Sequence, residues 1–314
     1  MAYVRTEYPQ WSWSFSRQQI FASCRRRYYY NYYASHNGWE QGAPPEAALA
    51  YRLKKLSNIY TVLGDAVHKC AQSMVERLSL GRSLPSAEAV EEEIRRQLRR
   101  VWKSSRDDRD LFLMRPNRVD MLHEFYYGRG VSESVVERIN QRIVQASEGL
   151  VNSSVWDELA AAGAEVISCE QFDTILIADT PVYAVPDLVF RKPGGEWVVV
   201  DWKTGEEAEE NRDQVALYVL FVHKKYQAPV EQITARLEYL NLKTKIEMRF
   251  DVQDVRAVEQ SALESMERMR ELLRSPELNA PQPKGSFPLT EDRDQCPWCS
   301  FYELCQEELE RSVS

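Results

Sequence analysis

In the second half of the chain, segments with strand-like runs of apolar residues alternate with segments in which apolar residues have helical spacing. Runs of strand-forming residues separated by turn residues predict five strands, at about 165–178, 182–191, 196–202, 233–242 and 245–251. Helical spacing predicts two helices among them, at about 207–226 and 252–274. The pattern indicates an α/β protein in which helices flank a mixed central sheet.

The first half of the chain has mainly helical spacing. Ser14 or Ser16 is a candidate N-cap for a first helix that includes Cys24. A loop is expected at residues 36–50, where glycine and paired prolines interrupt the pattern. A second long helix is expected at about 58–79.

Residues from about 86 to 162 are rich in Glu and Arg and helical throughout, which predicts a helical insertion ahead of the sheet. Prolines after residue 275 indicate an extended linker before the last cysteines. We therefore expect four segments: N-terminal helices at 1–80, the insertion at 81–163, the core with the sheet at 164–275, and the linker with the C-terminal cysteines at 276–314.

Composition and charge narrow the class of protein. The chain has 314 residues with 44% hydrophobic content, enough for one large or two modest domains. It has no apolar run of membrane-spanning length and no secretory signal pattern, and its six cysteines then suggest reduced thiols or metal ligands. We expect a cytoplasmic protein with no membrane partner. A net charge of −8 argues against a surface coated with basic residues for duplex binding.

Two carboxylates and a lysine occur where two of the predicted strands meet. Asp187 lies within one strand region, and Asp201-Trp202-Lys203 ends the next, after the apolar run 197–200. Period-two alternation places Asp201 and Lys203 on one face, with the ring of Trp202 on the other. Carboxylate oxygens suit a hard divalent cation, and a lysine can orient water or stabilise a phosphoryl transition state. This combination is typical of metal-dependent phosphodiester cleavage, whereas the alternative is a surface hairpin with ordinary charges.

The run Arg25-Arg26-Arg27 passes directly into a stretch of tyrosines. Arginines that meet phosphates beside aromatic rings that stack on bases are typical of single-strand binding, so these arginines are candidate DNA contacts. The alternative is that the tyrosines are core residues of a helix.

Three cysteines near the end of the chain have close spacing. Cys296, Cys299 and Cys305 form a C-x2-C-x5-C pattern, which favours bound metal over free thiols. Zinc and an iron–sulfur cluster both remain open. A zinc knuckle needs a second short ligand pair, and none is nearby.

Taken together, these motifs resemble the PD-(D/E)xK nuclease superfamily. Gly64-Asp65-Ala66-Val67-His68 is similar to the family helix that presents a histidine to the metal, and Gln214 and Tyr218 match the Gln-x-x-x-Tyr motif of the RecB-type branch. Cys24 with the three late cysteines is similar to the iron–sulfur nuclease domain of AddB and to the CRISPR-associated adaptation nuclease.

The resemblance implies a restriction-endonuclease-like core with a 4Fe–4S cluster that joins the N- and C-terminal segments through Cys24, Cys296, Cys299 and Cys305. It implies that His68, Asp187, Asp201 and the Trp202 carbonyl bind Mg2+ or Mn2+, with Lys203 catalytic. Gln214 and Tyr218 would guide the strand, although Tyr218 could simply pack the helix. Glu170 would lie near the metal or support Lys203, or be only an edge-strand charge.

The function implied is a DNA exonuclease acting on single strands, with 5′-to-3′ polarity favoured, in repair, recombination or CRISPR adaptation. The chain contains no phosphate-binding loop of the Gly-x-x-x-x-Gly-Lys type, so a helicase would be a separate partner. The main alternative is a catalytically weak DNA-binding subunit of such a complex. A zinc-dependent RNA-processing protein would rest on the cysteines alone.

Overall fold

The computed structural model describes residues 5–311 and divides the chain into two compact units. Unit 1 comprises Met1–Asn58, Val101–Gly130 and Glu264–Ser314, and unit 2 comprises Ile59–Arg100 and Val131–Leu263. Residues 101–130 of the expected segment 81–163 therefore belong to unit 1 and the rest to unit 2. The boundary after residue 100 falls inside one long helix. No helix in the described range is long and apolar enough to cross a membrane.

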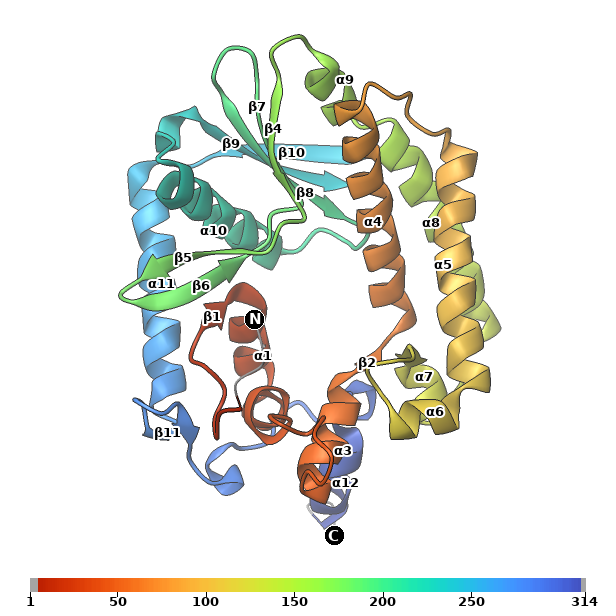
Figure 1. The fold of residues 1–314 in the computed structure, drawn as a ribbon, viewed down its shortest axis with the longest axis vertical. Coiled ribbons are helices and arrows are strands. Elements are labelled where there is room, and N and C mark those ends of the chain that lie inside the picture. Colours follow the sequence, from red (N-terminus) through yellow and green to blue (C-terminus); the bar gives the residue numbers. More distant parts are fainter. Residues whose placement is uncertain (1–4, 312–314) are drawn as a thin grey trace. The chain divides into compact units, whose positions relative to one another are not determined.

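Unit 2 is built on a five-stranded mixed sheet with the order β10-β9-β8-β7-β4 (Figure 1). Only the β8–β9 pair is parallel, and the helix α10 connects these two strands. The strands are β4 Glu165–Cys169, β7 Leu188–Arg191, β8 Trp197–Lys203, β9 Ile233–Tyr239 and β10 Thr244–Arg249. A separate antiparallel hairpin consists of β5 Asp173–Ile177 and β6 Thr180–Ala184.

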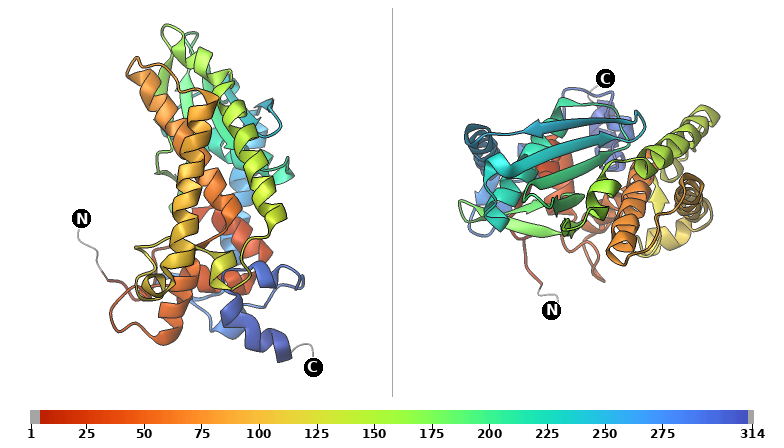
Figure 2. Two further views of the ribbon diagram at one scale, coloured as in Figure 1. Left: turned by 90° about the vertical axis from the view of Figure 1, so that its right-hand side faces the viewer. Right: turned by 90° about the horizontal axis from the view of Figure 1, so that it is seen from above.

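Helices cover both faces of this sheet. The core lies where the buried run Val215–Val222 of α10 meets the buried β8 residues 198–200. On the opposite face, Trp156 of α9 stacks on Trp202. The helices α4, α5 and α8 lie side by side at one edge (Figures 1 and 2). The unit 2 helices are α4 Ile59–Ser79, α5 Ala87–Asp107 (shared with unit 1), α8 Glu133–Val151, α9 Val155–Ala160, α10 Glu209–Tyr226 and α11 Val252–Arg270 (also shared), with a 3-10 turn at Val230–Gln232.

The helix α8 approaches the end of β9 very closely. A Cβ atom on Gly149 would lie 2.2 Å from the carbonyl oxygen of Leu240, so only glycine fits there. The side chain of Ser132 starts α8 by accepting a hydrogen bond from the Val135 backbone N–H. These local features fix the position of α8 beside the sheet.

Unit 1 is mainly helical. Its core contains Tyr30, Leu53, Phe112, Tyr126 and Phe301, all buried. Its helices are α1 Phe15–Ser23, α2 Arg25–Tyr29, a π-helix Tyr30–Ala34, α3 Pro45–Lys54, α6 Arg109–Met114, α7 His123–Tyr126 and α12 Tyr302–Arg311, with 3-10 turns at Lys284–Ser286 and Cys296–Trp298. Its short strands are β1 Trp13–Ser14, β2 Leu56–Ser57, β3 Met121–Leu122, β11 Leu273–Ser275 and β12 Ala280–Pro281.

Most element types agree with the sequence pattern, but the segment 86–162, expected to be helical throughout, contains the strand β3, and several boundaries differ. The expected strand 165–178 is two strands, β4 and β5, because the chain turns at Glu170, which has a φ of +47°. The expected strand 182–191 is also two, β6 and β7. The loop expected at 36–50 ends early, because Pro45 begins α3. The helix expected at 252–274 ends at Arg270.

Candidate active site

Two buried carboxylates lie at the edge where β7 begins and β8 ends. Asp187 directly precedes β7 and Asp201 lies in β8, and these side chains are 5% and 2% exposed. The backbone N–H of Trp202 donates to Asp187 Oδ2 over 2.6 Å, so β8 itself holds the Asp187 carboxylate. Lys203 Nζ lies 2.7 Å from Asp201 Oδ2. The antiparallel register produces this arrangement. It pairs Leu188 with Val200, so Asp187 and Asp201 each lie one residue beyond this pair, at the same end.

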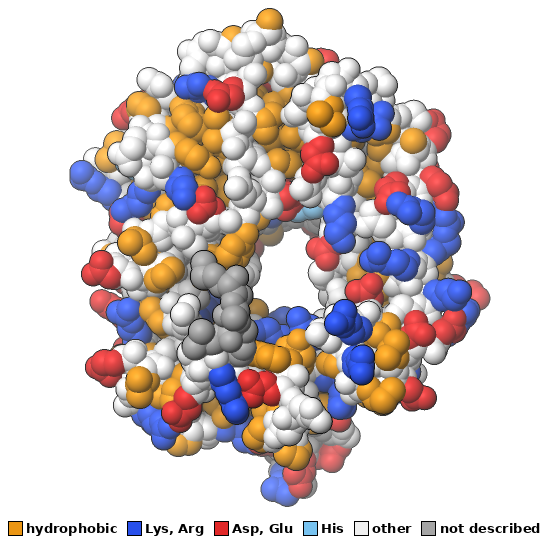
Figure 3. Space-filling view, viewed as in Figure 1, with side chains coloured by type: hydrophobic (Ala, Val, Ile, Leu, Met, Phe, Trp, Pro, Cys, Tyr) orange, Lys and Arg blue, Asp and Glu red, His pale blue; other side chains and the backbone are white. Residues whose placement is uncertain are grey.

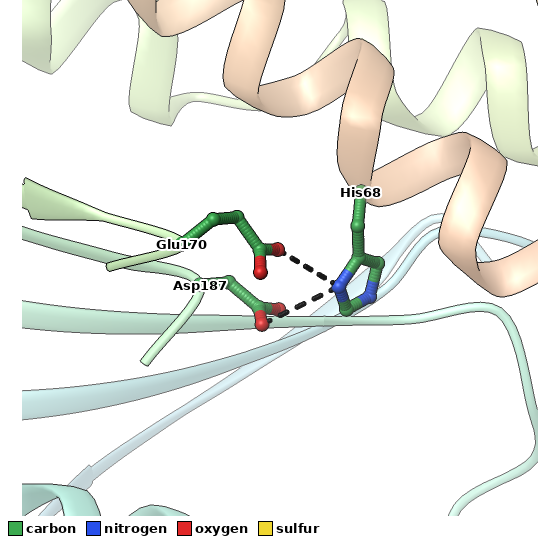
Figure 4. Close-up of side chains that lie close together, drawn as sticks. All are labelled: His68, Glu170 and Asp187. Carbon is green, nitrogen blue, oxygen red and sulfur yellow. Dashed lines mark ion pairs between the residues drawn. The ribbon is translucent and has the colours of Figure 1, made fainter. Parts of the chain in front are cut away.

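The helix α4 places His68 beside Asp187 and Glu170 (Figure 4). His68 Nδ1 lies 3.0 Å from Glu170 Oε1 and 3.5 Å from Asp187 Oδ1, and His68 Nε2 lies 3.0 Å from the Trp202 carbonyl oxygen. Both ring nitrogens therefore face acceptors, as in a protonated imidazole. Burial lowers the pKa of His68, but the charges of Asp187 and Glu170 outweigh it and raise this pKa to about 9.

Glu170 comes to the site through the turn that ends β4. Its left-handed φ of +47° is uncommon for a residue other than glycine, and its backbone N–H donates to the Asp187 carbonyl oxygen over 3.0 Å. This turn directs the Glu170 side chain towards His68. Glu170 is therefore part of the carboxylate group around the site and not an isolated edge-strand charge.

The donor set fits a hard divalent cation. One ligand atom from each of His68, Glu170 and Asp187 lies within 4.8 Å of the others. Glu170 Oε1 and Asp201 Oδ2 are buried and receive no hydrogen bond of good geometry, although a nitrogen lies near each. Burial raises the pKa of Asp187 and of Asp201, and each of these carboxylates faces further acidic groups. A bound cation would relieve this repulsion, once His68 releases its proton.

A chain of hydrogen bonds from α10 leads to the lysine. Lys203 Nζ donates to Gln214 Oε1 over 2.7 Å, and Gln214 Nε2 donates to the Tyr218 hydroxyl over 2.7 Å. The two α10 residues share one face because they are four positions apart. Tyr218 is 6% exposed, so its ring packs inside unit 2. Its hydroxyl holds Gln214 against Lys203.

The ring of Trp202 lies on the face of the sheet opposite Asp201 and Lys203, as alternation predicts, but its anchor there, Glu238, was not predicted from the sequence. The Trp202 indole N–H donates to Glu238 Oε2 over 3.2 Å, and Ser153 donates to the same oxygen over 2.6 Å. Glu238 is directly opposite Trp202 in the parallel β8–β9 register. Charged residues inside the apolar strand 233–239 are the signal that could have identified Glu238. Trp202 is thus fixed through its ring while its backbone contacts Asp187 and His68.

Unit 1 contains a second candidate site formed by cysteines. Cys24, Cys296, Cys299 and Cys305 all line one cavity of about 190 Å3. Cys24 was expected to lie within the first helix, but it does not. It has an extended backbone between α1 and α2, and its sulfur accepts from the Arg27 backbone N–H at 3.4 Å. Burial raises the pKa of Cys305 to about 12, so this thiol is protonated without a bound metal. Cys70 and Cys169 belong to unit 2, outside this cavity.

The basic-aromatic run near the N-terminus is largely core. Tyr28, Tyr30 and Tyr33 are buried, so they do not form a stacking surface. The expectation that Arg26 contacts DNA is wrong, because its buried guanidinium donates to Glu308 and to the Phe287 carbonyl oxygen.

The other two arginines of the run differ from Arg26. The Arg25 guanidinium lies 3.4 Å from the Phe21 ring centroid, and the Arg27 side chain lines the cysteine cavity. Both are half-buried, so a DNA contact by either remains a prediction.

The model of the PD-(D/E)XK nuclease superfamily matches residues 12–306. The chain belongs to this superfamily. The match covers both units, and the mixed sheet with its flanking helices is consistent with the fold of this superfamily. Membership indicates metal-dependent nuclease activity with Mg2+ or Mn2+, and His68, Glu170 and Asp187 form a group that can bind such an ion. A search of curated proteins gave no match.

Proposed function

We propose that this superfamily member is a deoxyribonuclease that hydrolyses single-stranded DNA from its 5′ end. One observation carries the proposal. Ligand atoms of His68, Glu170 and Asp187 lie within 4.8 Å of one another, beside the ion pair of Asp201 and Lys203. The preference for single strands and for 5′ ends rests on the resemblance to RecB-type nucleases. On the face shown in Figure 3, acidic and basic side chains are interspersed, so this face has no broad basic surface for duplex DNA.

One group of residues would bind the metal ion, and Lys203 would position the attacking water. The carboxylates of Asp187, Asp201 and Glu170, with neutral His68, would hold the ion. When bound, Mg2+ or Mn2+ supplies Lewis acidity to the phosphate and to the attacking water. Asp201 and Gln214 hold the ammonium group of Lys203 beside the proposed metal site. There it can orient the attacking water and balance the negative charge that develops on the phosphate. Water attacks phosphorus, the bond to the leaving sugar oxygen breaks, and that oxygen takes up a proton.

We also propose that the four cysteines of unit 1 hold a 4Fe–4S cluster with a structural role. A zinc ion with Zn–S bonds of about 2.3 Å would gather its ligands around one point. Within residues 5–311, the side chains spaced for a single ion are His68, Glu170 and Asp187, whereas the cysteines surround a cavity. Soft thiolates around a larger volume suit a cluster. It would join the beginning of the chain to its end.

Cleavage of labelled oligonucleotides tests the proposed function. Single strands and duplexes labelled at the 5′ or the 3′ end are incubated with Mn2+, with Mg2+ or with excess chelator. We expect a 5′-labelled single strand to release short labelled products first, and only when metal is present. Binding without cleavage under every condition would support the alternative of a DNA-binding subunit. Equal cleavage in chelator would contradict the proposal.

A further inference from the structure

One face of α4 continues from the metal site along the loop that follows the lysine. Tyr60, Gly64 and His68 are spaced four residues apart and so share this face. A Cβ atom on Gly64 would lie 3.6 Å from Thr204 Oγ1, and Thr204 directly follows Lys203. The face therefore lies against the start of the loop 204–208. Tyr60 is two helical turns, about 12 Å, from His68 along the helix axis.

At the far end of this face, Tyr60 supports a cation from α8. The guanidinium carbon of Arg142 lies 5.2 Å from the Tyr60 ring centroid. Among the described residues, Arg142 forms an ion pair with Glu206, whose Oε1 lies 3.9 Å from its Nη2, the outer limit for an ion pair. Glu206 is 88% exposed, whereas Arg142 is 25% exposed. Arg142 is thus held in place by an aromatic ring while its charge is only loosely paired.

The charges of the site explain why a cation is needed here. Asp187, Asp201 and Glu170 repel the phosphates of a strand, and Lys203 is already engaged by Asp201 and Gln214. An arginine fork is well suited to a phosphate oxygen pair. A single strand lying along this face of α4 can therefore place a phosphate on Arg142 while another phosphate lies at the metal site.

We propose that Arg142 binds a phosphate of the DNA strand near the one being cut, and that Glu206 occupies Arg142 until DNA displaces it. This rests on the proposed function. The carboxylate of Glu206 presents two oxygens, as a phosphate does, from a loop that begins at the catalytic lysine. Exposed ion pairs contribute little, so exchanging Glu206 for a phosphate costs little.

Binding of a labelled oligothymidine in chelator, measured over a range of salt concentrations, tests the pair. Arg142→Ala should weaken binding about tenfold and reduce the salt slope by about 0.7, the value for one phosphate on a single strand. Glu206→Gln should tighten binding two- to fivefold in the wild-type background and have no effect in Arg142→Ala. The control Arg256→Ala removes an exposed arginine from α11, on the side of the unit opposite α4 in Figure 1.

The outcomes separate the two proposals. A wild-type protein that neither binds nor cuts single strands overturns the proposed function, and this inference with it. If the wild type binds, an unchanged affinity and slope for Arg142→Ala overturns only the role of Arg142. If Arg142→Ala fails to fold, as seen by circular dichroism, Glu206→Gln still decides, since unchanged or weaker binding by that variant contradicts the displacement.

Discussion

Stability without metal should depend strongly on pH because of His68. Its pKa is raised from 6.5 to about 9 in the folded protein by Asp187 and Glu170. The folded state therefore keeps a proton that the unfolded chain releases. This contribution to stability is fully present below pH 6.5 and is lost as the pH rises through 9. The raised pKa of Asp187 acts in the same direction.

The magnitude follows from the size of the shift. At about 1.4 kcal/mol per pKa unit, the difference between 6.5 and about 9 corresponds to roughly 3 kcal/mol. About 30% of the His68 side chain is exposed, and solvent screening reduces the effect. We expect the free energy of unfolding in chelator to fall by about 1–2 kcal/mol between pH 6.5 and pH 9.

Urea unfolding in excess chelator at a series of pH values measures this loss. His68→Gln should reduce the slope between pH 6.5 and pH 9 and leave the part that Asp187 contributes. The control His223→Gln, which changes a histidine bonded to the Ala228 carbonyl oxygen, should leave the slope unchanged. Saturating Mn2+ should reverse the trend, because the ion competes with the proton on His68. A flat profile in chelator, or an unchanged slope in His68→Gln, would refute the reasoning.

Three further variants test the cysteine cavity, the hydrogen-bond chain and the anchor of β8. Cys299→Ser should bleach the brown colour of anaerobically purified protein and lower its stability. The control Cys70→Ser, outside the cavity, should keep the iron. A colourless wild type with one bound zinc would contradict the cluster. Tyr218→Phe should slow cleavage with little change in DNA affinity, as steady-state kinetics and binding titrations can show. Trp202→Phe removes the N–H that Glu238 accepts, and should cost about 1–3 kcal/mol in urea unfolding and weaken Mn2+ binding.

The parts of the site that lie on regular elements were predictable from the sequence. Asp201 and Lys203 follow an apolar run that defines β8, so alternation alone places them on one face. Gln214 and Tyr218 share a helix face through their spacing. The assignment of His68 depended on the family resemblance, because a histidine on a helix carries no local sign of its partner.

Features that depend on distant partners were not predictable. Tyrosines after arginines read equally well as a DNA surface or as core, and the burial of Arg26 depends on Glu308 at the other end of the chain. The breaks in the strand patterns arise where β4 and β7 turn to bring Glu170 and Asp187 together, although the local residues still favour strand. The bond between Trp202 and Glu238 requires the parallel pairing of β8 and β9.

The most direct test of the central claim compares the wild type with Lys203→Ala. Single-turnover cleavage of a 5′-labelled single strand in Mn2+ is measured beside DNA affinity, Mn2+ affinity and unfolding of the same preparations. Lys245→Ala, an exposed lysine of β10, is the matched control. We predict that Lys203→Ala abolishes cleavage while folding and DNA binding stay near those of the wild type, because the lysine acts on the transition state. Cleavage at the wild-type rate by Lys203→Ala, or by the wild type in excess chelator, would contradict the account.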